Sequence, residues 1–278
     1  MKIFLTGGTG FIGKNFINLA LKNGHHIFAI TRKKNQSKID KLTWLLGEID
    51  DDWSKYLKDI DVVVHLAAKG VIYDKKDDNK SIFKFNVEKS LSMILNLIKN
   101  NCINFVIAST SSEYFNDGEC KKSKLKISSK RGLSSSYSAS KIIFTNILEI
   151  ISKKSKCNFR IMRIFPTYGE GECANRLYPT IKKNAQKGKN LFIKNPNEIR
   201  DFTNVEYVSK VLLEACKFKK KKNFDIFHVS SNNKMSIKEF ASKQWKKYKA
   251  KGKLTFDKGS NKFTRHVSNK NSVWKIQN

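Results

Sequence analysis

The chain has 278 residues, 40% of them hydrophobic, and its 55 lysines and arginines stand against 24 aspartates and glutamates, which gives a formal net charge of +31. A chain of this length can bury a full core, as one large domain or as one domain with a small appendage. No apolar run approaches the roughly 18 residues of a membrane span, and the first expected strand begins at Lys2, so we expect neither a membrane anchor nor a signal peptide.

The cysteines and the charge narrow the class of protein. The five cysteines are odd in number and include no C-x-x-C pair, a pattern that favours reduced thiols in a cytoplasmic protein over disulfides or a metal site. The excess of bases would suit an anionic partner, but they are mostly lysines spread along the chain, and they are not interleaved with aromatic residues as in a groove for single-stranded nucleic acid. We therefore interpret the charge as a solvated lysine-rich surface and regard nucleic-acid binding as the less favoured alternative.

The beginning of the chain places an apolar strand directly before glycines spaced G-x-x-G-x-x-G. Gly7 permits a tight turn, Gly10 lets the backbone approach a pyrophosphate, and Gly13 lets the following helix lie close to the strand. Phe11 and Ile12 begin that helix, whose N-terminus offers free N–H groups to an anion. The sequence therefore predicts a dinucleotide site here; a glycine-rich turn without a ligand is the alternative.

A second buried strand is expected at residues 25–31, and the residues at its end decide which dinucleotide fits. An acidic residue there would bind the ribose 2′-hydroxyl of NAD. This chain has Thr31 and Arg32, followed by two lysines, which suit a 2′-phosphate. The pattern favours NADP(H) over NAD(H), unless these are ordinary surface bases of a lysine-rich chain.

Further strands are expected at residues 42–46, 61–66, 103–109 and 159–165, with helical patterns at 77–100 and 136–151 between them. This alternation is typical of a doubly wound, parallel α/β sheet. His65 lies inside a continuous apolar strand, and we interpret it as a core histidine. After about residue 172 the pattern loosens into helices at 176–187 and 236–248, short strands at 191–194 and 224–229, and a polar tail from residue 259.

Tyr137 and Lys141 lie four residues apart on one expected helix and so share a face of it. A nearby cation favours the phenolate and lowers the pKa of the tyrosine, so that the tyrosine can act as an acid or base at a carbonyl or hydroxyl. Thr110, at the end of the preceding strand, is in place to hydrogen-bond the substrate oxygen. The alternative is a half-buried tyrosine beside a solvated lysine, but the order of these motifs after a dinucleotide turn favours catalysis.

As an ordered set, these motifs resemble those of the extended short-chain dehydrogenase/reductases, in the NAD-dependent epimerase/dehydratase family that acts on nucleotide sugars. The matching segments are 6–13, 65–68, 108–110 with Tyr114, 137–141, 163–169 and 200–202. The resemblance implies a Rossmann-type, doubly wound parallel sheet with a small discontinuous C-terminal substrate-binding domain. We expect the NAD(P)-binding domain at residues 1–165 and the substrate-binding part mainly at 166–278, with about 200–230 returning to the first domain.

The resemblance also implies roles for individual residues. Tyr137 would be the acid/base, Lys141 would tune it and hold the nicotinamide ribose, and Thr110 would orient the substrate. Besides Gly7, Gly10, Phe11, Ile12, Gly13, Thr31 and Arg32, the cofactor would contact Glu48, Ile49, Leu66, Ala67 and Ala68. Besides Thr110, the substrate would contact Ser111, Ser112, Arg176, Leu177 and Arg200. No metal site is expected.

Departures from the family pattern bear on the reaction. Dehydratases of this family carry an acid two residues after the serine or threonine, where this chain has Ser112, with Glu113 one position later, so dehydration is disfavoured. Pro166 stands where asparagine is usual, and the C-terminal part ends soon after Trp274, so the substrate domain is expected to be trimmed.

Reduction and epimerisation remain as the candidate reactions. A 4-epimerase keeps one NAD bound, whereas a reductase consumes NADPH and releases the product, so Arg32 favours a reductase. The resemblance is to enzymes that reduce the C4 keto group of nucleotide-linked 4-keto-6-deoxysugars for surface polysaccharides; a 4-epimerase is the alternative. A non-catalytic, NADP-sensing or nucleic-acid-associated Rossmann protein is the alternative of another class, and it would be expected to lack the Thr110–Tyr137–Lys141 set.

A homodimer is the expected assembly. Family members commonly pair the helices at 77–100 and 136–151 into a four-helix bundle across a twofold axis. Here we expect Met93, Leu97, Ile143 and Ile147 to exceed what one face of the sheet can cover.

Overall fold

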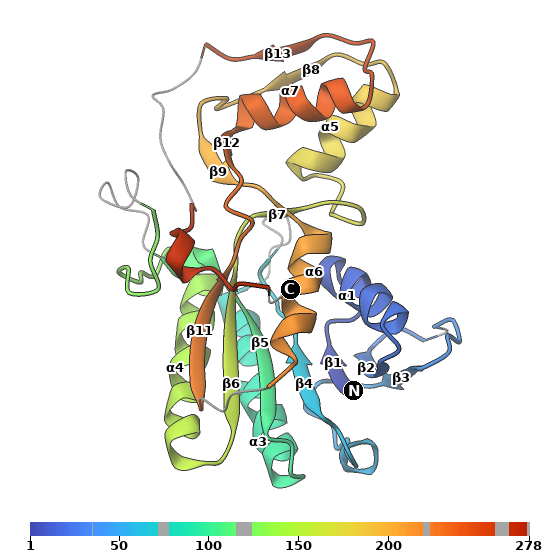
Figure 1. The fold of residues 1–278 in the computed structure, drawn as a ribbon, viewed down its shortest axis with the longest axis vertical. Helices are drawn as coiled ribbons and strands as arrows, with labels where there is room; N and C mark the ends of the chain where they lie inside the picture. Colours follow the sequence, from blue (N-terminus) through green and yellow to red (C-terminus); the bar gives the residue numbers. More distant parts are fainter. Residues whose placement is uncertain (35, 72–77, 115–123, 219–222, 259–266, 277–278) are drawn as a thin grey trace.

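A seven-stranded parallel sheet forms the centre of the protein (Figure 1). The computed structural model describes residues 1–278 except for 35, 72–77, 115–123, 219–222, 259–266 and 277–278. The strands lie in the order β11-β6-β5-β4-β1-β2-β3. They are β1 (Lys2–Thr6), β2 (His26–Thr31), β3 (Leu42–Leu46), β4 (Val62–His65), β5 (Asn104–Thr110), β6 (Asn158–Ile164) and β11 (Phe224–Val229). The doubly wound fold predicted from the sequence is confirmed.

The strand order reverses between β1 and β4, and this reversal positions the site. From β1 the chain builds outward through β2 to β3, and from β4 it builds in the opposite direction. Ligands of open α/β sheets bind beyond the carboxyl ends of the strands at such a switch point. There Thr6 pairs with His65, so the glycine turn after β1 lies beside residues 66–68 after β4.

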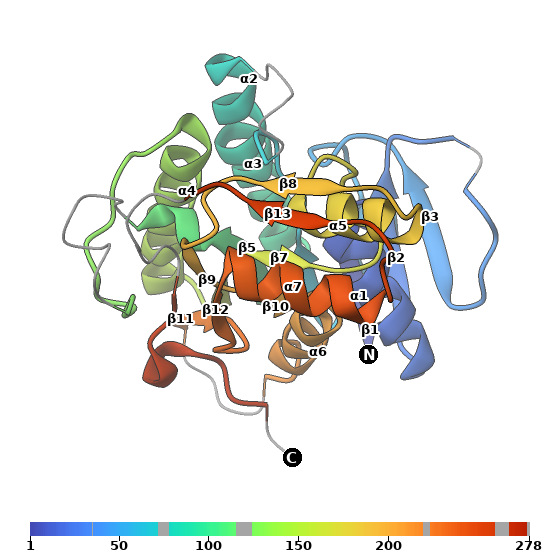
Figure 2. The same ribbon diagram turned by 90° about the horizontal axis from the view of Figure 1, so that it is seen from above.

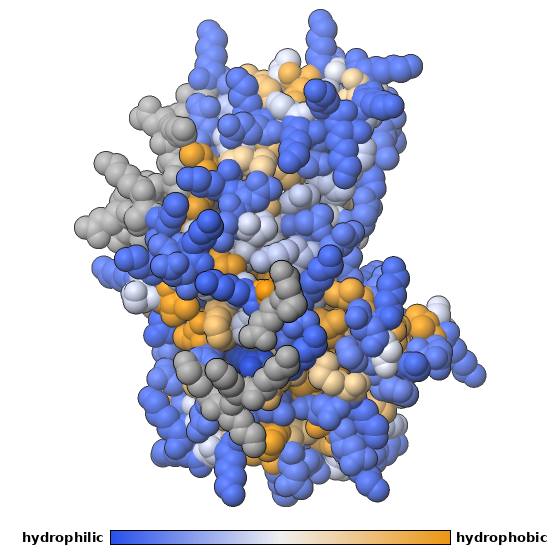
Figure 3. Space-filling model, in the orientation of Figure 1, coloured by the Kyte–Doolittle hydropathy of each residue, from blue (hydrophilic) through white to orange (hydrophobic). Residues whose placement is uncertain are grey.

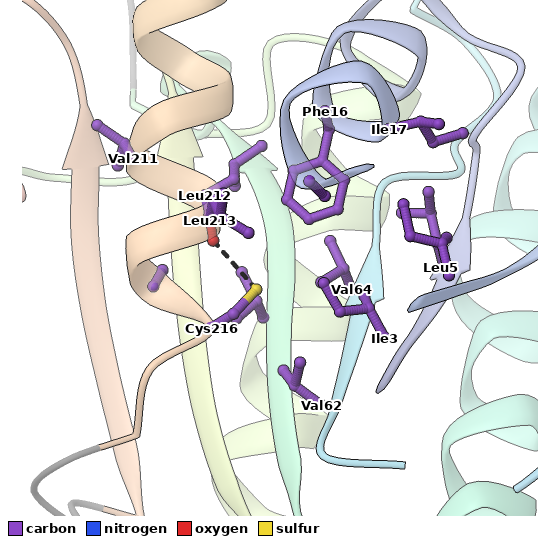
Figure 4. Close-up of a cluster of buried hydrophobic side chains, with 14 of the residues drawn as sticks. Ile3, Leu5, Phe16, Ile17, Val62, Val64, Val211, Leu212, Leu213 and Cys216 are labelled. Atoms are coloured by element: carbon purple, nitrogen blue, oxygen red, sulfur yellow. Dashed lines mark hydrogen bonds between the residues drawn. The ribbon is translucent and has the colours of Figure 1, made fainter. Parts of the chain in front are cut away.

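Helices cover both faces of the sheet. On one face lie α1 (Phe11–Lys22) and α6 (Val205–Ala215), packed on the aliphatic side chains of β1 and β4 (Figure 4). On the other lie α2 (Asn79–Phe83), a π-helical segment (Lys84–Lys89), α3 (Ser90–Lys99) and α4 (Ser136–Lys154). A sheet buried on both faces explains why its strands are almost continuously apolar.

A smaller layer lies beyond the carboxyl ends of the strands (Figures 1 and 2). It contains α5 (Leu177–Gln186), α7 (Ile237–Lys247), and the strand pairs β8 (Leu191–Ile193) with β13 (Leu254–Phe256), β9 (Ile199–Asp201) with β12 (Lys234–Ser236), and β7 (Thr167–Tyr168) with β10 (Thr203–Asn204). Its core is aromatic, with the rings of Phe202 and Phe240 stacked at 4.0 Å. The domain boundary at residues 165 and 166 stays a prediction.

The sequence interpretation missed several features of the second half of the chain. Strands β7, β9, β10, β12 and β13 have two or three residues each, too short for a hydrophobic period to be recognised. The tail is also more ordered than expected over its described part, residues 267–276. There Val273 bridges to His228, the Trp274 N–H donates to the His228 carbonyl at 3.0 Å, and the Trp274 ring packs on Phe227.

Part of the expected dimer surface is wrong. Met93 and Leu97 are only 2% and 1% exposed, because they pack beneath the sheet as core residues. Ile143 is 40% exposed, and Leu95 and Ile150 are exposed as well. On the opposite side of the molecule, the face in Figure 3 is largely hydrophilic, with hydrophobic patches separated by polar side chains. None of the described helices has the length and apolarity that crossing a membrane requires.

Candidate active site

The glycine turn has the shape that a dinucleotide phosphate needs. Gly7 has φ +75°, and a Cβ built on it would lie 2.7 Å from the Ala67 nitrogen. A Cβ on Gly13 would lie 2.1 Å from the Gly7 oxygen, so neither position admits a side chain without movement of the backbone. Gly10 is the N-cap of α1 and has no side chain with which to cap it. The first N–H groups of the helix therefore remain for an anion, which fits the diphosphate of NAD or NADP.

The segment after β4 forms the opposite wall of this crevice. The Thr6 hydroxyl accepts a hydrogen bond from the Ala67 N–H at 3.2 Å and lies 2.7 Å from Nδ1 of His65. Burial, and secondly the charge of Lys141, lowers the pKa of His65 to about 3. His65 is thus a neutral, hydrogen-bonded core residue, as the sequence predicted.

Asn86 fixes this wall, and sequence reasoning missed it. Its side chain accepts from the Lys69 N–H at 2.8 Å and donates to the Lys69 carbonyl and to Oγ of Ser140, both at 3.0 Å. It therefore ties residues 66–70 to α4, where a Cβ on Gly70 would lie 3.3 Å from the Cβ of Tyr137. The one local signal in the sequence is that Asn86 stands between the apolar residues Phe85 and Val87.

The end of the crevice where the adenosine is expected is exposed. Thr31 is buried and its hydroxyl accepts from the Lys33 N–H at 3.0 Å, whereas the Arg32 side chain is 66% exposed. One guanidinium nitrogen of Arg32 lies 4.0 Å from a carboxylate oxygen of Glu48. Lys89 contacts both Glu48, at 3.6 Å, and Asp50, at 2.9 Å. Ile49, the other residue expected at the adenine, is buried beneath them.

The catalytic candidates meet at the end of β5. The Lys141 ammonium donates to the carbonyl of Ala108 at 3.0 Å, and the hydroxyl of Thr110 lies near the phenol of Tyr137, close enough to lower its pKa. Tyr137 and Lys141 both lie in the first turns of α4. That helix begins with a capping box between Ser135 and Ser138, which fixes its start. The structure thus brings the three predicted residues together.

The pKa of Tyr137 differs from the one expected for a tyrosine beside Lys141. Burial raises the pKa of Tyr137 to about 12, the hydrogen bond with Thr110 lowers it, and the charge of Glu113 raises it. The expected lowering of the tyrosine pKa is therefore wrong for this structure, because desolvation of the phenol dominates. Burial lowers the pKa of Lys141 to about 8, and Glu113 raises it. Near pH 7 the tyrosine is neutral and the lysine is still mainly an ammonium.

Glu113 is buried, and both oxygens of its carboxylate are bonded within the protein. Its side chain is fully buried, with one carboxylate oxygen accepting from the Ser109 hydroxyl and the other from Nε of Arg163 at 3.0 Å and Nη2 of Arg163 at 2.9 Å. Since both oxygens are occupied, this carboxylate does not replace the acid that dehydratases carry at the position of Ser112.

The expected substrate residues lie in different surroundings. Ser111 is buried, and the Ser112 N–H donates to the Thr110 hydroxyl at 3.1 Å. In the smaller layer, Arg176 directly precedes Leu177 at the start of α5. The Arg176 guanidinium donates to the carbonyl of Val71, in the segment after β4, at 2.8 Å. Arg200 donates to Glu198 at 2.6 Å, a partner that the sequence interpretation missed. Their contacts with a substrate stay predictions.

Comparison with known proteins agrees with this architecture. A profile of the NAD dependent epimerase/dehydratase family matches residues 3–229. The UDP-glucose 4-epimerase of Lactobacillus helveticus is 23% identical over 256 residues, which cover 83% of this chain and 77% of that protein. A sterol-4-alpha-carboxylate 3-dehydrogenase of Dictyostelium discoideum is 30% identical over 91 residues, 31% of this chain and 27% of that relative.

Solved structures show the same fold. A UDP-N-acetylglucosamine 4-epimerase from Methanobrevibacter ruminantium M1, in complex with UDP-N-acetylmuramic acid, superposes with a TM-score of 0.84 at 20% identity, over 96% of this chain and 89% of that one. The protein MoeE5, in complex with UDP-glucuronic acid and NAD, superposes with a TM-score of 0.82 at 17% identity, over 100% of this chain and 95% of that one.

Proposed function

Because the chain belongs to the NAD dependent epimerase/dehydratase family, we propose that it transfers hydride at C4 of a nucleotide-linked sugar, reducing a 4-keto-6-deoxysugar with NADPH. The observation that carries the proposal is the meeting of Thr110, Tyr137 and Lys141 at the carboxyl end of β5. This place adjoins the switch point of the sheet, where an α/β fold binds its ligands.

The residues of the crevice fit a nicotinamide cofactor. The N–H groups at the start of α1, around Phe11 and Ile12, would hold its diphosphate, and Lys141 would hold the nicotinamide ribose. Glu48 and Ile49 would flank its adenine. When bound, the nicotinamide supplies or accepts the hydride.

Tyr137 would supply the proton. With a pKa raised to about 12, it carries its proton at neutral pH and can donate it to the C4 oxygen as the carbonyl is reduced. Thr110, whose hydroxyl lies near the phenol, would hold the same oxygen. The Lys141 ammonium would favour the phenolate that the proton transfer leaves behind.

Arg32 supports NADPH and hence reduction. Its side chain is 66% exposed, and its contact with Glu48 is long, at 4.0 Å, while Lys89 contacts both acids of this cluster. An exposed guanidinium is well suited to a bidentate contact with a 2′-phosphate. A reductase that consumes a cofactor in every turnover must also release it, which an exposed adenosine end permits.

A 4-epimerase is the second candidate, and the relatives favour it. The Lactobacillus helveticus protein aligned over 83% of the chain is a UDP-glucose 4-epimerase. The same tyrosine, lysine and threonine would serve that reaction, with Tyr137 first accepting the proton of the C4 hydroxyl and then returning it to the C4 oxygen. Dehydration is disfavoured, because Ser112 stands at the position of the acid and Glu113 is buried.

The test is a screen of nucleotide sugars by absorbance at 340 nm. A reductase consumes NADPH stoichiometrically with one 4-keto nucleotide sugar, and the Tyr137→Phe protein is the control. A 4-epimerase instead interconverts C4 epimers, followed by chromatography, with no net change at 340 nm. Purified protein that binds nucleotide sugars but does neither would contradict both assignments.

A further inference from the structure

Three successive residues at the end of β5 hold three ionisable side chains. The Ala108 carbonyl accepts from Lys141, the Ser109 hydroxyl donates to Glu113, and the Thr110 hydroxyl lies near the phenol of Tyr137. Glu113 therefore belongs to the same constellation as the catalytic candidates, although its carboxylate does not face the crevice.

The carboxylate of Glu113 is held as a charge inside the protein. Glu113 and Arg163 have side chains that are 0% and 1% exposed, and they share a two-bond ion pair. Arg163 also donates to the Tyr114 hydroxyl at 2.7 Å, and that hydroxyl contacts Nε2 of His228. The opposite ring nitrogen of His228 lies 2.8 Å from the Ser268 hydroxyl, so the network extends from the site to the C-terminal tail.

A buried ion pair gives little net stability. The loss of hydration of two charges offsets most of their attraction, and apolar residues of similar volume often do as well. A fully buried pair directly beside a catalytic constellation therefore suggests a contribution to the site.

Lys141 needs a countercharge in this position. It is buried, and its neighbours Tyr137 and His65 are neutral near pH 7. Glu113 is the one acidic group among the described residues whose charge raises the pKa of Lys141, against the larger effect of burial. Arg163 pairs with Glu113 and holds it in place.

We propose that Glu113, anchored by Arg163, is a positioning residue that keeps Lys141 an ammonium beneath the reacting tyrosine. The role rests on the proposed function, in which Lys141 supports Tyr137 and holds the cofactor ribose. It explains why this chain carries an acid at residue 113 that cannot reach a substrate.

The test reads the titration of Lys141 directly. Protein labelled with ¹³C at the lysine ε-carbon is titrated by NMR, with the Lys141 signal identified by its loss in Lys141→Met. The wild-type midpoint is expected at a pH of about 8. In Glu113→Gln the midpoint should fall by roughly one pH unit or more, because an opposite charge at close range shifts a pKa by that amount.

Two further variants separate charge from structure. Tyr114→Phe removes a hydrogen bond to Arg163 but leaves the Glu113 charge, so the midpoint should stay at the wild-type value. Glu113→Gln combined with Arg163→Met leaves no unpaired buried charge, so it should fold even if the single variant does not. Its midpoint should also fall.

An unchanged or raised midpoint in the Glu113 variants would overturn the proposal, and so would a fall in Tyr114→Phe equal to theirs. Because the measurement needs neither substrate nor turnover, it remains decisive if no 4-keto sugar is reduced, which would refute only the proposed function. Where a substrate is found, the alkaline limb of the pH–rate profile should move with the midpoint.

Discussion

Two ion pairs lie near the expected cofactor crevice, and they are built in opposite ways. Beside the catalytic candidates, Glu113 and Arg163 are 0% and 1% exposed and lie within 2.9 Å. At the end where the adenosine is expected, Glu48 and Arg32 are 40% and 66% exposed and lie 4.0 Å apart. The first pair is fixed by backbone and buried side chains on every side, whereas the second can rearrange around a ligand.

The difference separates chemistry from cofactor choice. Proton transfer needs groups held at constant distances with constant charges, which burial and hydrogen bonds provide. Selection between NAD and NADP needs only one charge placed near one ribose, which an exposed side chain provides. Substitutions at the two ends should therefore impair different properties: turnover and stability at the buried end, and cofactor choice at the exposed end.

The largest effect is expected from Tyr137→Phe. The ring, its packing and the cofactor crevice are retained, but the transferable proton is lost. Turnover should fall by ~10²–10⁴-fold with little change in NADPH affinity, measured by steady-state kinetics and by cofactor fluorescence. Thr110→Val should slow turnover less, because it removes one hydrogen bond and no proton. Wild-type turnover in Tyr137→Phe would place the chemistry elsewhere.

The two ion pairs should differ in stability. Arg163→Met leaves Glu113 buried without its partner and should lower the free energy of unfolding by ~3–5 kcal/mol. Glu48→Gln at the exposed pair should change it by less than ~1 kcal/mol. Urea unfolding followed by circular dichroism measures both. Equal losses of unfolding free energy in the two variants would show that burial does not make the Glu113–Arg163 pair more sensitive to substitution.

Cofactor choice should respond at the exposed end alone. We expect NADPH to bind at least ~10-fold more tightly than NADH, about 1.4 kcal/mol, through a charge-assisted contact of Arg32 with the 2′-phosphate. Arg32→Asp should reverse this order without altering the unfolding midpoint. Lys33→Asp is the matched control for the change of charge. Equal affinities in the unmodified protein would speak against NADP specificity.

The smallest effect on the crevice is expected from the helices behind it. The proposed homodimer would cover Ile143, which is 40% exposed and lines a surface hollow of about 450 Å³ with Phe83 and Val87. Light scattering should give twice the chain mass of 32.0 kDa. Ile143→Lys should give the monomer with cofactor affinity unchanged. A monomeric wild type at micromolar concentration would argue against the dimer.

The sequence predicted the elements whose signal is long or local. The seven-stranded sheet follows from repeated apolar runs, and the glycine turn from its spacing between a strand and a helix. The helix expected at residues 236–248 is observed as α7 (Ile237–Lys247), and Ser236 and Glu239 form a capping box at its start. The set of Thr110, Tyr137 and Lys141 followed from motif order.

The parts that sequence reasoning missed depend on distant contacts. The pairing of Glu113 with Arg163 joins the short turn after β5 to β6, and Asn86 bonds Lys69, which follows β4. Neither contact leaves a periodic pattern in the sequence. Met93 and Leu97 were assigned to a dimer face, because apolar helix residues look alike whether a sheet or a second subunit covers them. The pKa of Tyr137 was misjudged for a similar reason: desolvation depends on the packed environment.

The position of β11 has a consequence for how the chain is completed during synthesis. This outermost strand pairs with β6, but it follows β6 only after an excursion of roughly 60 residues that contains much of the smaller layer. Its free edge is then met by Val273 and Trp274, which follow it later in the chain. Until those residues emerge, an open edge strand is offered to any neighbouring chain. Removal of residues 267–278 should therefore promote aggregation more than it impairs the fold.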